Sequence, residues 1–196
     1  MSSNADQQAK WDDRYRRSSV VDARPARVLT DYGHLLPAAG DALDVASGLG
    51  GNAVFIARRG LRVQAWDLSA VAMTKLRDYA AEQGLEVYAQ ARDVSREPLP
   101  REAFDVIVVS RFLDRALPSA LVTALRPGGL LFYQTFLRES VGGATGPRNP
   151  RFLLGTNELI RLFCALRLVA YREEGLIGDQ RAGFRNEALF IGQKQP

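Results

Sequence analysis

The chain has 196 residues, of which 46% are hydrophobic and 24% charged, and its formal net charge is +4. This length and composition suit one folded domain with a substantial core and exclude an intrinsically disordered chain. No run approaches the roughly 20 apolar residues of a membrane helix, and the polar start has no apolar signal core, so we expect a cytoplasmic protein. The basic residues are scattered arginines without a long block, which gives no argument for a nucleic-acid partner.

The predicted secondary structure begins with two helices and continues as an alternation of strands and helices. Ser69 is expected to cap the fourth helix, and Gly84 is expected to end it. Apolar spacing predicts helices over residues 7–18, 23–36, 51–60, 70–84, 116–129 and 156–167. Short apolar runs predict strands over residues 41–47, 61–69, 85–95, 102–112, 130–136, 166–174 and 186–195.

The order of these elements predicts an α/β fold. Alternating strands and helices of this length form a doubly wound, mostly parallel sheet with helices on both faces. The last two strands have no long helix between them, so they can only pair as an antiparallel hairpin. We therefore expect a seven-stranded, Rossmann-like sheet in a single domain over residues 1–196, with residues 1–37 as a helical extension or lid.

A glycine-rich turn, GLGGNA at residues 48–53, lies between the first strand of the sheet and the helix that follows. It satisfies the pattern G-x-G-x-x-G/A, and Asp67 follows at the end of the second strand. On these two facts alone, a nicotinamide or flavin dinucleotide site is permitted. The antiparallel hairpin near the C-terminus does not belong to the dinucleotide-binding layout and favours a different ligand.

Four further features make the chain similar to the class I S-adenosylmethionine-dependent methyltransferases. Asp44 lies in the first strand, Asp93 closes the third, LRPGGLL precedes the fifth, and the hairpin completes the sheet. The resemblance extends from about residue 38 onward and implies S-adenosylmethionine as the cofactor. The family usually has glycine where this chain has Ala46. Because alanine favours negative φ, we expect extended backbone at this residue.

The resemblance implies a set of cofactor contacts at the carboxyl ends of the strands. Gly48 and Gly50 would let the backbone approach the amino-acid head and the ribose without a Cβ in the way. Asp67 would accept hydrogen bonds from both ribose hydroxyls. The other expected contacts are Leu68, Asp93 and Val94 around the adenine, Trp11 and Tyr15 as a lid, and Asp44, Ala46, Asn52 and Ser110 near the turn.

Within this family the chain resembles small bacterial methyltransferases of the TehB, tellurite-resistance type. The similar segments include KWDDRYRR at residues 10–17 and PRNPRFLL at residues 147–154. The resemblance implies a small, soft or anionic acceptor of the tellurite, selenite or thiol type. SRFLD at residues 110–114 stands where enzymes that methylate amines of bases or glutamine often carry N/D-P-P-Y/F, which argues against a nucleic-acid substrate.

The candidate catalytic residues are those that can stabilise an anionic acceptor. Methyl transfer to a soft anion needs charge complementarity and a dry site more than a strong base. The single histidine, His34, precedes the sheet, whereas Arg111 directly follows the fourth strand, beside the expected methyl position. The other candidates for acceptor contacts are Tyr133, Asp114, Arg148, Arg151, Arg181 and Arg185.

Two alternative functions stay open on the sequence. A sensor that binds S-adenosylmethionine without chemistry would share the turn, and a dinucleotide-dependent oxidoreductase would bind NAD in preference. The single cysteine, Cys164, excludes an intrachain disulfide, and its apolar surroundings predict that it is buried. Without a Cys/His cluster we expect no metal. We expect a monomer or homodimer that acts on a small molecule and has no nucleic-acid or membrane partner.

Overall fold

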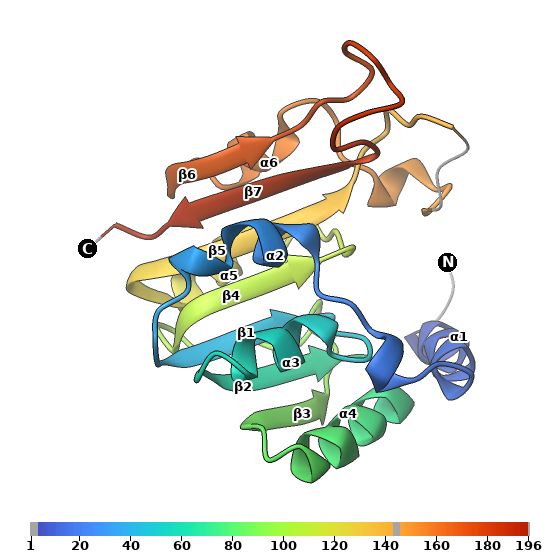
Figure 1. Cartoon of the computed structure of the whole chain (residues 1–196), viewed down its shortest axis with the longest axis vertical. Coiled ribbons are helices and arrows are strands. Elements are labelled where there is room, and N and C mark those ends of the chain that lie inside the picture. Colours follow the sequence, from blue (N-terminus) through green and yellow to red (C-terminus); the bar gives the residue numbers. More distant parts are fainter. Residues whose placement is uncertain (1–3, 143–145, 196) are drawn as a thin grey trace.

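The computed structural model describes residues 4–142 and 146–195, and a seven-stranded sheet forms its centre (Figure 1). The strand order is β3-β2-β1-β4-β5-β7-β6, and β7 is antiparallel to both of its neighbours. The predicted mostly parallel sheet with a C-terminal antiparallel hairpin is therefore confirmed. The strands are β1 Asp41–Val45, β2 Arg62–Asp67, β3 Val87–Ala91, β4 Phe104–Ser110, β5 Leu125–Phe136, β6 Arg167–Arg172 and β7 Glu187–Gln193.

Helices cover both faces of the sheet, as the sequence predicts. Residues of α2, α3 and α4 pack against one face, and residues of α5 and α6 pack against the other. In Figure 1, α1 lies beyond the ends toward which the arrows of β1, β2 and β4 point. The helices are α1 Asn4–Arg16, η1 Val20–Asp22, α2 Arg27–Tyr32, η2 Gly33–Leu35, α3 Gly51–Ala57, α4 Ala70–Glu82, α5 Pro118–Ala124, η3 Pro150–Phe152 and α6 Glu158–Leu162.

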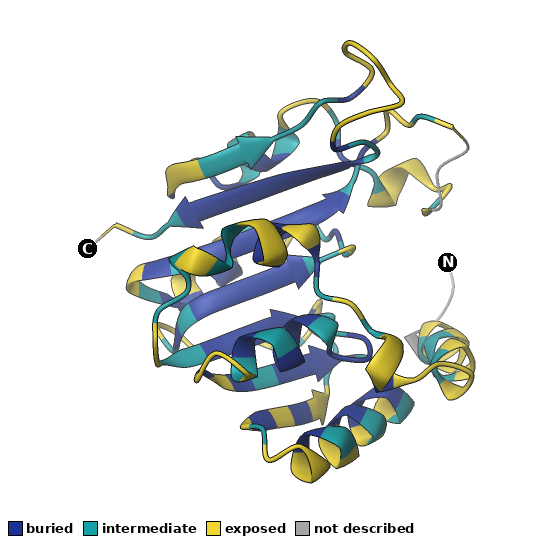
Figure 2. Ribbon diagram, in the orientation of Figure 1, coloured by how far each residue is buried: buried dark blue, intermediate teal, exposed yellow. Residues whose placement is uncertain are grey.

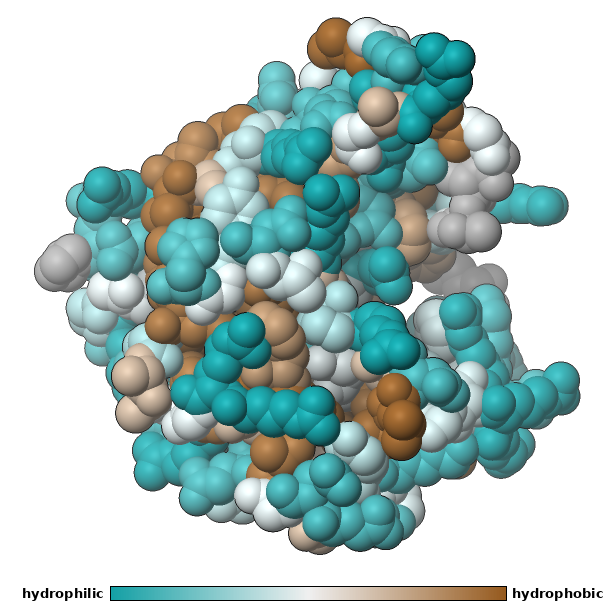
Figure 3. Space-filling model, viewed as in Figure 1, coloured by the Kyte–Doolittle hydropathy of each residue, from teal (hydrophilic) through white to brown (hydrophobic). Residues whose placement is uncertain are grey.

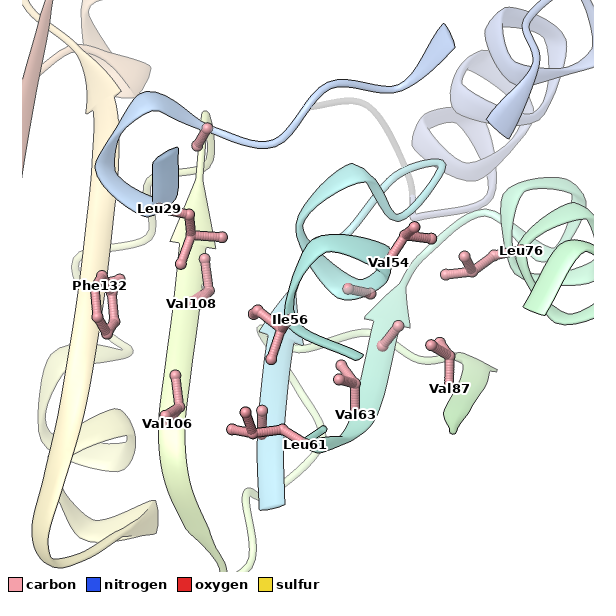
Figure 4. Close-up of a cluster of buried hydrophobic side chains, with 14 of the residues drawn as sticks. Leu29, Val54, Ile56, Leu61, Val63, Leu76, Val87, Val106, Val108 and Phe132 are labelled. Carbon is pink, nitrogen blue, oxygen red and sulfur yellow. The ribbon is translucent and has the colours of Figure 1, made fainter. Parts of the chain in front are cut away.

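The core consists of two apolar layers, one on each face of the sheet. Successive residues of β4 alternate between the layers because neighbouring side chains of a strand point to opposite faces. Val106 and Val108 pack with the layer of α2 to α4, and Ile107 and Val109 pack with the layer of α5 and α6. Figure 2 shows the central strands as the most deeply buried elements. Figure 4 shows side chains of the first layer, among them Leu29 of α2.

The ends of α4 follow the prediction. The Ser69 hydroxyl accepts a hydrogen bond from the Ala72 amide at 3.1 Å and caps the helix. Gly84 follows the helix with a φ of 62°, a left-handed conformation that glycine adopts without a Cβ penalty.

Two other predicted elements differ in the structure. Pro127 and the two glycines after it lie inside β5 and do not mark the end of a helix. The helix predicted over residues 156–167 is reduced to the single short α6. Cys164 lies beyond its end and is exposed, so the expectation of a buried cysteine is wrong.

The carboxyl ends of the parallel strands gather polar side chains at one edge of the sheet. Asp67 ends β2 and Ser110 ends β4. Because β7 runs antiparallel, its first residue, Glu187, reaches the same edge opposite Phe136, the last residue of β5. Within residues 4–142 and 146–195, no helix is long and apolar enough to cross a membrane.

Candidate functional site

The glycine-rich turn at the end of β1 adopts a left-handed backbone at three positions. Gly48 has a φ of 55° and Gly50 a φ of 76°. Ala46 has a φ of 53°, so the expectation of extended backbone at this residue is wrong. The left-handed region costs an L-residue roughly 1–2 kcal/mol relative to the right-handed one. The turn therefore imposes a glycine conformation on an alanine.

The two motif glycines are needed for different reasons. A Cβ at Gly48 would lie 2.8 Å from the Tyr15 hydroxyl oxygen, so the absence of a side chain at Gly48 lets Tyr15 of α1 approach the turn. A Cβ at Gly50 would lie 2.4 Å from a methyl carbon of Leu76. Gly50 thus lets the turn pack against α4, and the structure gives it a packing role. The contact between Gly50 and the cofactor stays a prediction.

Asp67 is fixed at the tip of β2 by two backbone amides. Gly48 N–H donates to Oδ2 and Ser69 N–H donates to Oδ1, each at 2.8 Å. The residue is 7% exposed, and burial raises the pKa of its carboxyl, while the two amides act in the opposite direction. Leu68 beside it is half-buried. Two backbone hydrogen bonds therefore hold the carboxylate beside Gly48.

Asp44 is fully buried beneath the turn and is bonded to the start of α3. Its Oδ2 accepts from Ala53 N–H at 3.1 Å, and its Oδ1 accepts from the Asn52 side chain at 3.3 Å. Asn52 also donates to the Ser110 hydroxyl at 2.9 Å and accepts from Ala26 N–H at 2.8 Å. Burial raises the pKa of Asp44 to about 7. These side chains tie β1, α3 and β4 together under the expected cofactor position.

Helix α1 is docked beside the turn by polar contacts of its C-terminal half and of the residues that follow it. The Asp12 carboxylate accepts from the Ser69 hydroxyl at 2.5 Å and from Val71 N–H at 3.3 Å, at the start of α4. Lys75 donates to the carbonyl oxygens of Tyr15, Arg16 and Ser18 at 2.7–3.0 Å. The docking contacts were not predicted from the sequence.

Trp11 and Tyr15 form the inner face of this helix. Their rings stack at 5.7 Å between centroids, with an interplanar angle of 20°. Burial, followed by the charge of Asp67, raises the pKa of the Tyr15 hydroxyl, so the hydroxyl remains protonated at neutral pH. The two residues predicted as a lid thus lie together at the turn. Their contact with a cofactor stays a prediction.

The end of β3 supplies the residues predicted to contact adenine. Asp93 Oδ1 accepts from Ser95 N–H at 3.0 Å, and its other oxygen lies 3.4 Å from Arg96. Val94 is buried in the layer of α5 and α6, next to the strand that ends at Asp67. Asp93 therefore shapes its own turn, and the predicted adenine contact stays a prediction.

Arg111 projects from the end of β4 and is aimed by a chain of buried polar groups. Its Nε donates to Glu187 Oε1 at 3.1 Å. Glu187 Oε2 accepts from the Gln134 side chain, and Gln134 Oε1 accepts from Val28 N–H at 2.7 Å. The Arg111 side chain is 62% exposed, whereas that of Glu187 is 11% exposed. Within the described residues, no hydrogen-bond partner engages the two terminal guanidinium nitrogens of Arg111.

Sequence reasoning missed Glu187 and Gln134. Each is a polar residue next to the apolar run of its strand, which is a visible signal. The sequence could not show that the two lie on adjacent strands, because that follows from the register of β5 and β7.

Three of the predicted catalytic residues, Tyr133, Arg181 and Arg185, make other contacts in this structure, and their contact with an acceptor stays a prediction. Tyr133 is 3% exposed in the layer of α5 and α6, and its hydroxyl donates to the Phe112 carbonyl at 2.9 Å. Burial raises the pKa of this hydroxyl, so it cannot serve as a base at neutral pH. Arg181 is 91% exposed and paired with Asp179 within its own loop. Tyr133 and Arg181 therefore have structural or solvent-exposed roles here.

Arg185 holds the loop between β6 and β7 in place. Its guanidinium donates to the carbonyl oxygens of Ala182, Glu174, Gly175 and Asp179 at 2.7–3.3 Å. Because its guanidinium donates to four backbone carbonyls, the Arg185 side chain stabilises the conformation of the loop. Its contact with an acceptor stays a prediction.

The remaining expected contacts lie apart from the turn. Asp114 Oδ1 accepts from Ala116 N–H at 3.0 Å, which starts the segment leading to α5. The Arg151 carbonyl accepts from Arg115 at 2.6 Å. Arg148 is exposed in the loop before η3. Among residues 4–142 and 146–195, no group of three or more His, Cys, Asp and Glu side chains could hold a metal ion.

Comparison with known proteins finds a methyltransferase-domain match over the turn and its surroundings. Residues 42–129 match the model of a methyltransferase domain. The chain is 31% identical over 134 residues to a ubiquinone biosynthesis O-methyltransferase from Nitrosococcus oceani. That match covers 65% of this chain and 57% of the enzyme, so the chain spans little more than half the length of this relative.

Solved structures share the fold at low sequence identity. The cyclase SpnF superimposes with a TM-score of 0.75 at 18% identity, over 98% of this chain and 96% of SpnF. TehB from Haemophilus influenzae superimposes with a TM-score of 0.69 at 17% identity, over 94% of this chain and 67% of TehB. These likenesses concern the fold. Over residues 42–129 the chain is similar to a methyltransferase domain, and over 134 residues it is similar to an O-methyltransferase.

Proposed function

We propose that the protein transfers a methyl group from S-adenosylmethionine to a small, anionic acceptor. The observation that carries this proposal is the position of the Asp67 carboxylate, held by the amides of Gly48 and Ser69 at the carboxyl edge of the sheet. Ligands of doubly wound sheets bind at this edge. The carboxylate is placed to accept from vicinal hydroxyls such as those of a ribose.

The charges at the turn fit the proposed cofactor better than a dinucleotide. Two buried acids, Asp44 and Asp67, lie on either side of the turn. An ionised carboxylate attracts an ammonium group and repels a pyrophosphate, and Asp44, with a pKa of about 7, contributes this charge only in part at neutral pH. The sequence pattern of the turn permits a dinucleotide-dependent oxidoreductase, but the acids around the turn disfavour it.

The chain's own residues would position the reactants and exclude water. When bound, S-adenosylmethionine would supply an electrophilic methyl group on a sulfonium and a neutral thioether as the leaving group. Asp67 would orient the ribose, and Trp11 with Tyr15 would cover the cofactor from α1. Arg111 would hold the negative charge of the acceptor near the reacting carbon through its two terminal nitrogens. Fixing two reactants in line supplies much of the rate in such a transfer.

Calorimetry with S-adenosylmethionine and S-adenosylhomocysteine tests the cofactor site. We expect Asp67→Ala to weaken both affinities by about 2 kcal/mol or more, close to thirty-fold, because hydrogen bonds to a charged group are lost. Asp78→Ala is the matched control, since Asp78 is an exposed aspartate of α4. An unchanged affinity in Asp67→Ala would show that the ribose binds elsewhere.

A transfer assay separates an enzyme from a sensor. The wild-type protein is incubated with methyl-labelled cofactor and with tellurite, selenite, thiols, catechols and phenolic acids. We expect labelled product from an anionic acceptor. Tight cofactor binding with no transfer to any of these would support the sensor.

A further inference from the structure

A polar pocket lies just beyond the end of β5, outside the turn that binds the cofactor in our proposal. It encloses about 390 Å³. Organic ligands commonly bind in pockets of ~300–1,000 Å³, and a bare inorganic oxyanion needs far less room. Its main lining residues are Phe136, Leu137, Arg138, Pro147, Arg148 and Leu153.

The charge of this pocket has one sign. Arg138 and Arg148 line it, and its described lining residues include no aspartate or glutamate. Both arginines are exposed, and no side-chain hydrogen bond engages either of them within the described residues. A guanidinium presents donors in a planar fork that matches a carboxylate. A neighbouring pocket of about 250 Å³ shares Arg138 but contains Glu139 and Glu173, so an anion is better matched by the first pocket.

The other wall of the pocket is apolar and flat. The Phe136 ring packs closely against Gly146, where an added Cβ would lie 3.0 Å from the ring. Leu153 and Pro147 continue this wall. Aromatic rings favour offset-stacked or edge-to-face contact with other rings. The combination of a flat apolar wall and two guanidinium groups fits a planar organic acid.

The backbone around the pocket is fixed by hydrogen bonds. Leu137 N–H donates to the Asn186 carbonyl and Arg138 N–H donates to the Leu154 carbonyl, each at 2.9 Å. The Asn186 side chain accepts from Val141 N–H at 2.6 Å and donates to the Val141 carbonyl at 3.2 Å. The pocket thus lies mainly in the segment that follows β5, and hydrogen bonds join this segment to Asn186, which directly precedes β7.

The pocket adjoins the expected site of methyl transfer. Phe136 lines the pocket and is the register partner of Glu187, the residue that orients Arg111. In the space-filling view (Figure 3), the surface is notched between α1 and the loops that follow β5. An acceptor in the pocket could therefore extend along this edge toward the end of β4.

We propose that this pocket holds the methyl acceptor, and that the acceptor is a planar organic acid whose carboxylate pairs with Arg138 and Arg148. This inference rests on the proposed function and names the substrate class of the same site. The body of the acceptor packs against Phe136, and its nucleophilic atom points toward Arg111. An inorganic oxyanion would leave most of the pocket unfilled.

Calorimetry with matched acids and amides tests the proposal. The probes are 3,4-dihydroxybenzoate, cinnamate and indole-3-acetate, each compared with its neutral amide, on protein saturated with S-adenosylhomocysteine. We expect at least one acid to bind at least ten-fold more tightly than its amide, with affinity that falls as salt is added. Arg138→Ala and Arg148→Ala should each weaken binding of that acid about ten-fold.

Arg101→Ala is the matched control, because Arg101 is an exposed arginine before the start of β4, at the opposite edge of the sheet. It should leave the affinity for the acid unchanged. Equal binding of acids and amides, binding of none of the acids, or undiminished binding by both pocket variants would overturn the proposal. If wild-type protein fails to bind S-adenosylhomocysteine itself, the proposed function fails instead, so the two failures are distinguishable.

Discussion

Replacing Asp44 with asparagine should change how the stability of the protein depends on pH. The side chain is fully buried, and this burial raises its pKa from 3.8 to about 7. Between these values the folded state keeps a proton that the unfolded chain has released. The free energy of unfolding therefore falls as pH rises from about 4 to about 7, by about 1.4 kcal/mol per pH unit from this group alone.

The contribution of Asp44 sums to about 4 kcal/mol across that window, on an order-of-magnitude basis. Other carboxyls titrate in the same range with the opposite sign. Glu158, for example, has a pKa lowered by its hydrogen bond from Arg115, so its contribution to stability rises with pH. Asparagine cannot titrate, so the difference between wild type and Asp44→Asn isolates the one group.

Urea unfolding at pH values from 4.5 to 8 measures this difference. We expect the stability of wild type relative to Asp44→Asn to fall by several kcal/mol up to about pH 7 and then to level off. Asp78→Asn, at an exposed position on α4, should show no such trend. If the difference in the free energy of unfolding between wild type and Asp44→Asn stays constant across the whole pH range, the raised pKa of Asp44 is refuted.

The other two predictions concern the strained turn and the orientation of Arg111. Ala46→Gly should raise the free energy of unfolding by about 0.5–1 kcal/mol, because glycine adopts the observed φ of 53° without strain; thermal unfolding should show a midpoint higher by about 2 °C, and a lower midpoint would contradict the left-handed assignment. Glu187→Gln should raise the KM for the acceptor and leave the affinity for S-adenosylhomocysteine unchanged, because it removes the charge that orients Arg111; an unchanged KM would show that Arg111 needs no orientation.

The architecture was predictable because its signals are local and redundant. FDVIVVS of β4 is buried on both faces and reads as a nearly continuous apolar run, and Ser69 and Gly84 mark the two ends of α4. The absence of a helix between the last two strands was enough to predict their antiparallel pairing. Such features depend on a few neighbouring residues, so they can be recognised without the tertiary structure.

The site was less predictable because its residues are selected by tertiary packing. Tyr133 and Gln134 are adjacent in β5, yet one lies in the layer of α5 and α6 and the other hydrogen-bonds at the opposite face. The two-residue period of a strand separates them, but it does not say which face carries the site. The loop contacts of Arg185 were missed for a related reason, since its four carbonyl partners come from a loop that only the folded chain brings around it.

The left-handed Ala46 shows how the same turn can override residue preference. Its neighbour Ser47 N–H donates to the Trp66 carbonyl at 3.0 Å, which joins the turn to β2, and the Gly48 amide must reach Asp67 one residue later. These two bonds fix the path of the chain on both sides of the strained residue. The left-handed backbone costs Ala46 roughly 1–2 kcal/mol. Leaving the buried Asp67 carboxylate without the Gly48 N–H donor would cost more, because a buried charged group would lose a hydrogen bond.

The N-terminus of α2, with its N-cap Ala26, connects the proposed cofactor site with the proposed acceptor site. Ala26 N–H donates to Asn52, which holds Asp44 and Ser110, and Val28 N–H donates to Gln134, which holds Glu187. The backbone amides of Ala26 and Val28 therefore fix the distance between the Asn52 side chain and the Gln134 side chain. Because a shift of this segment would move both groups together, the geometry between the cofactor turn and Arg111 depends on a backbone that contacts neither reactant in our proposal.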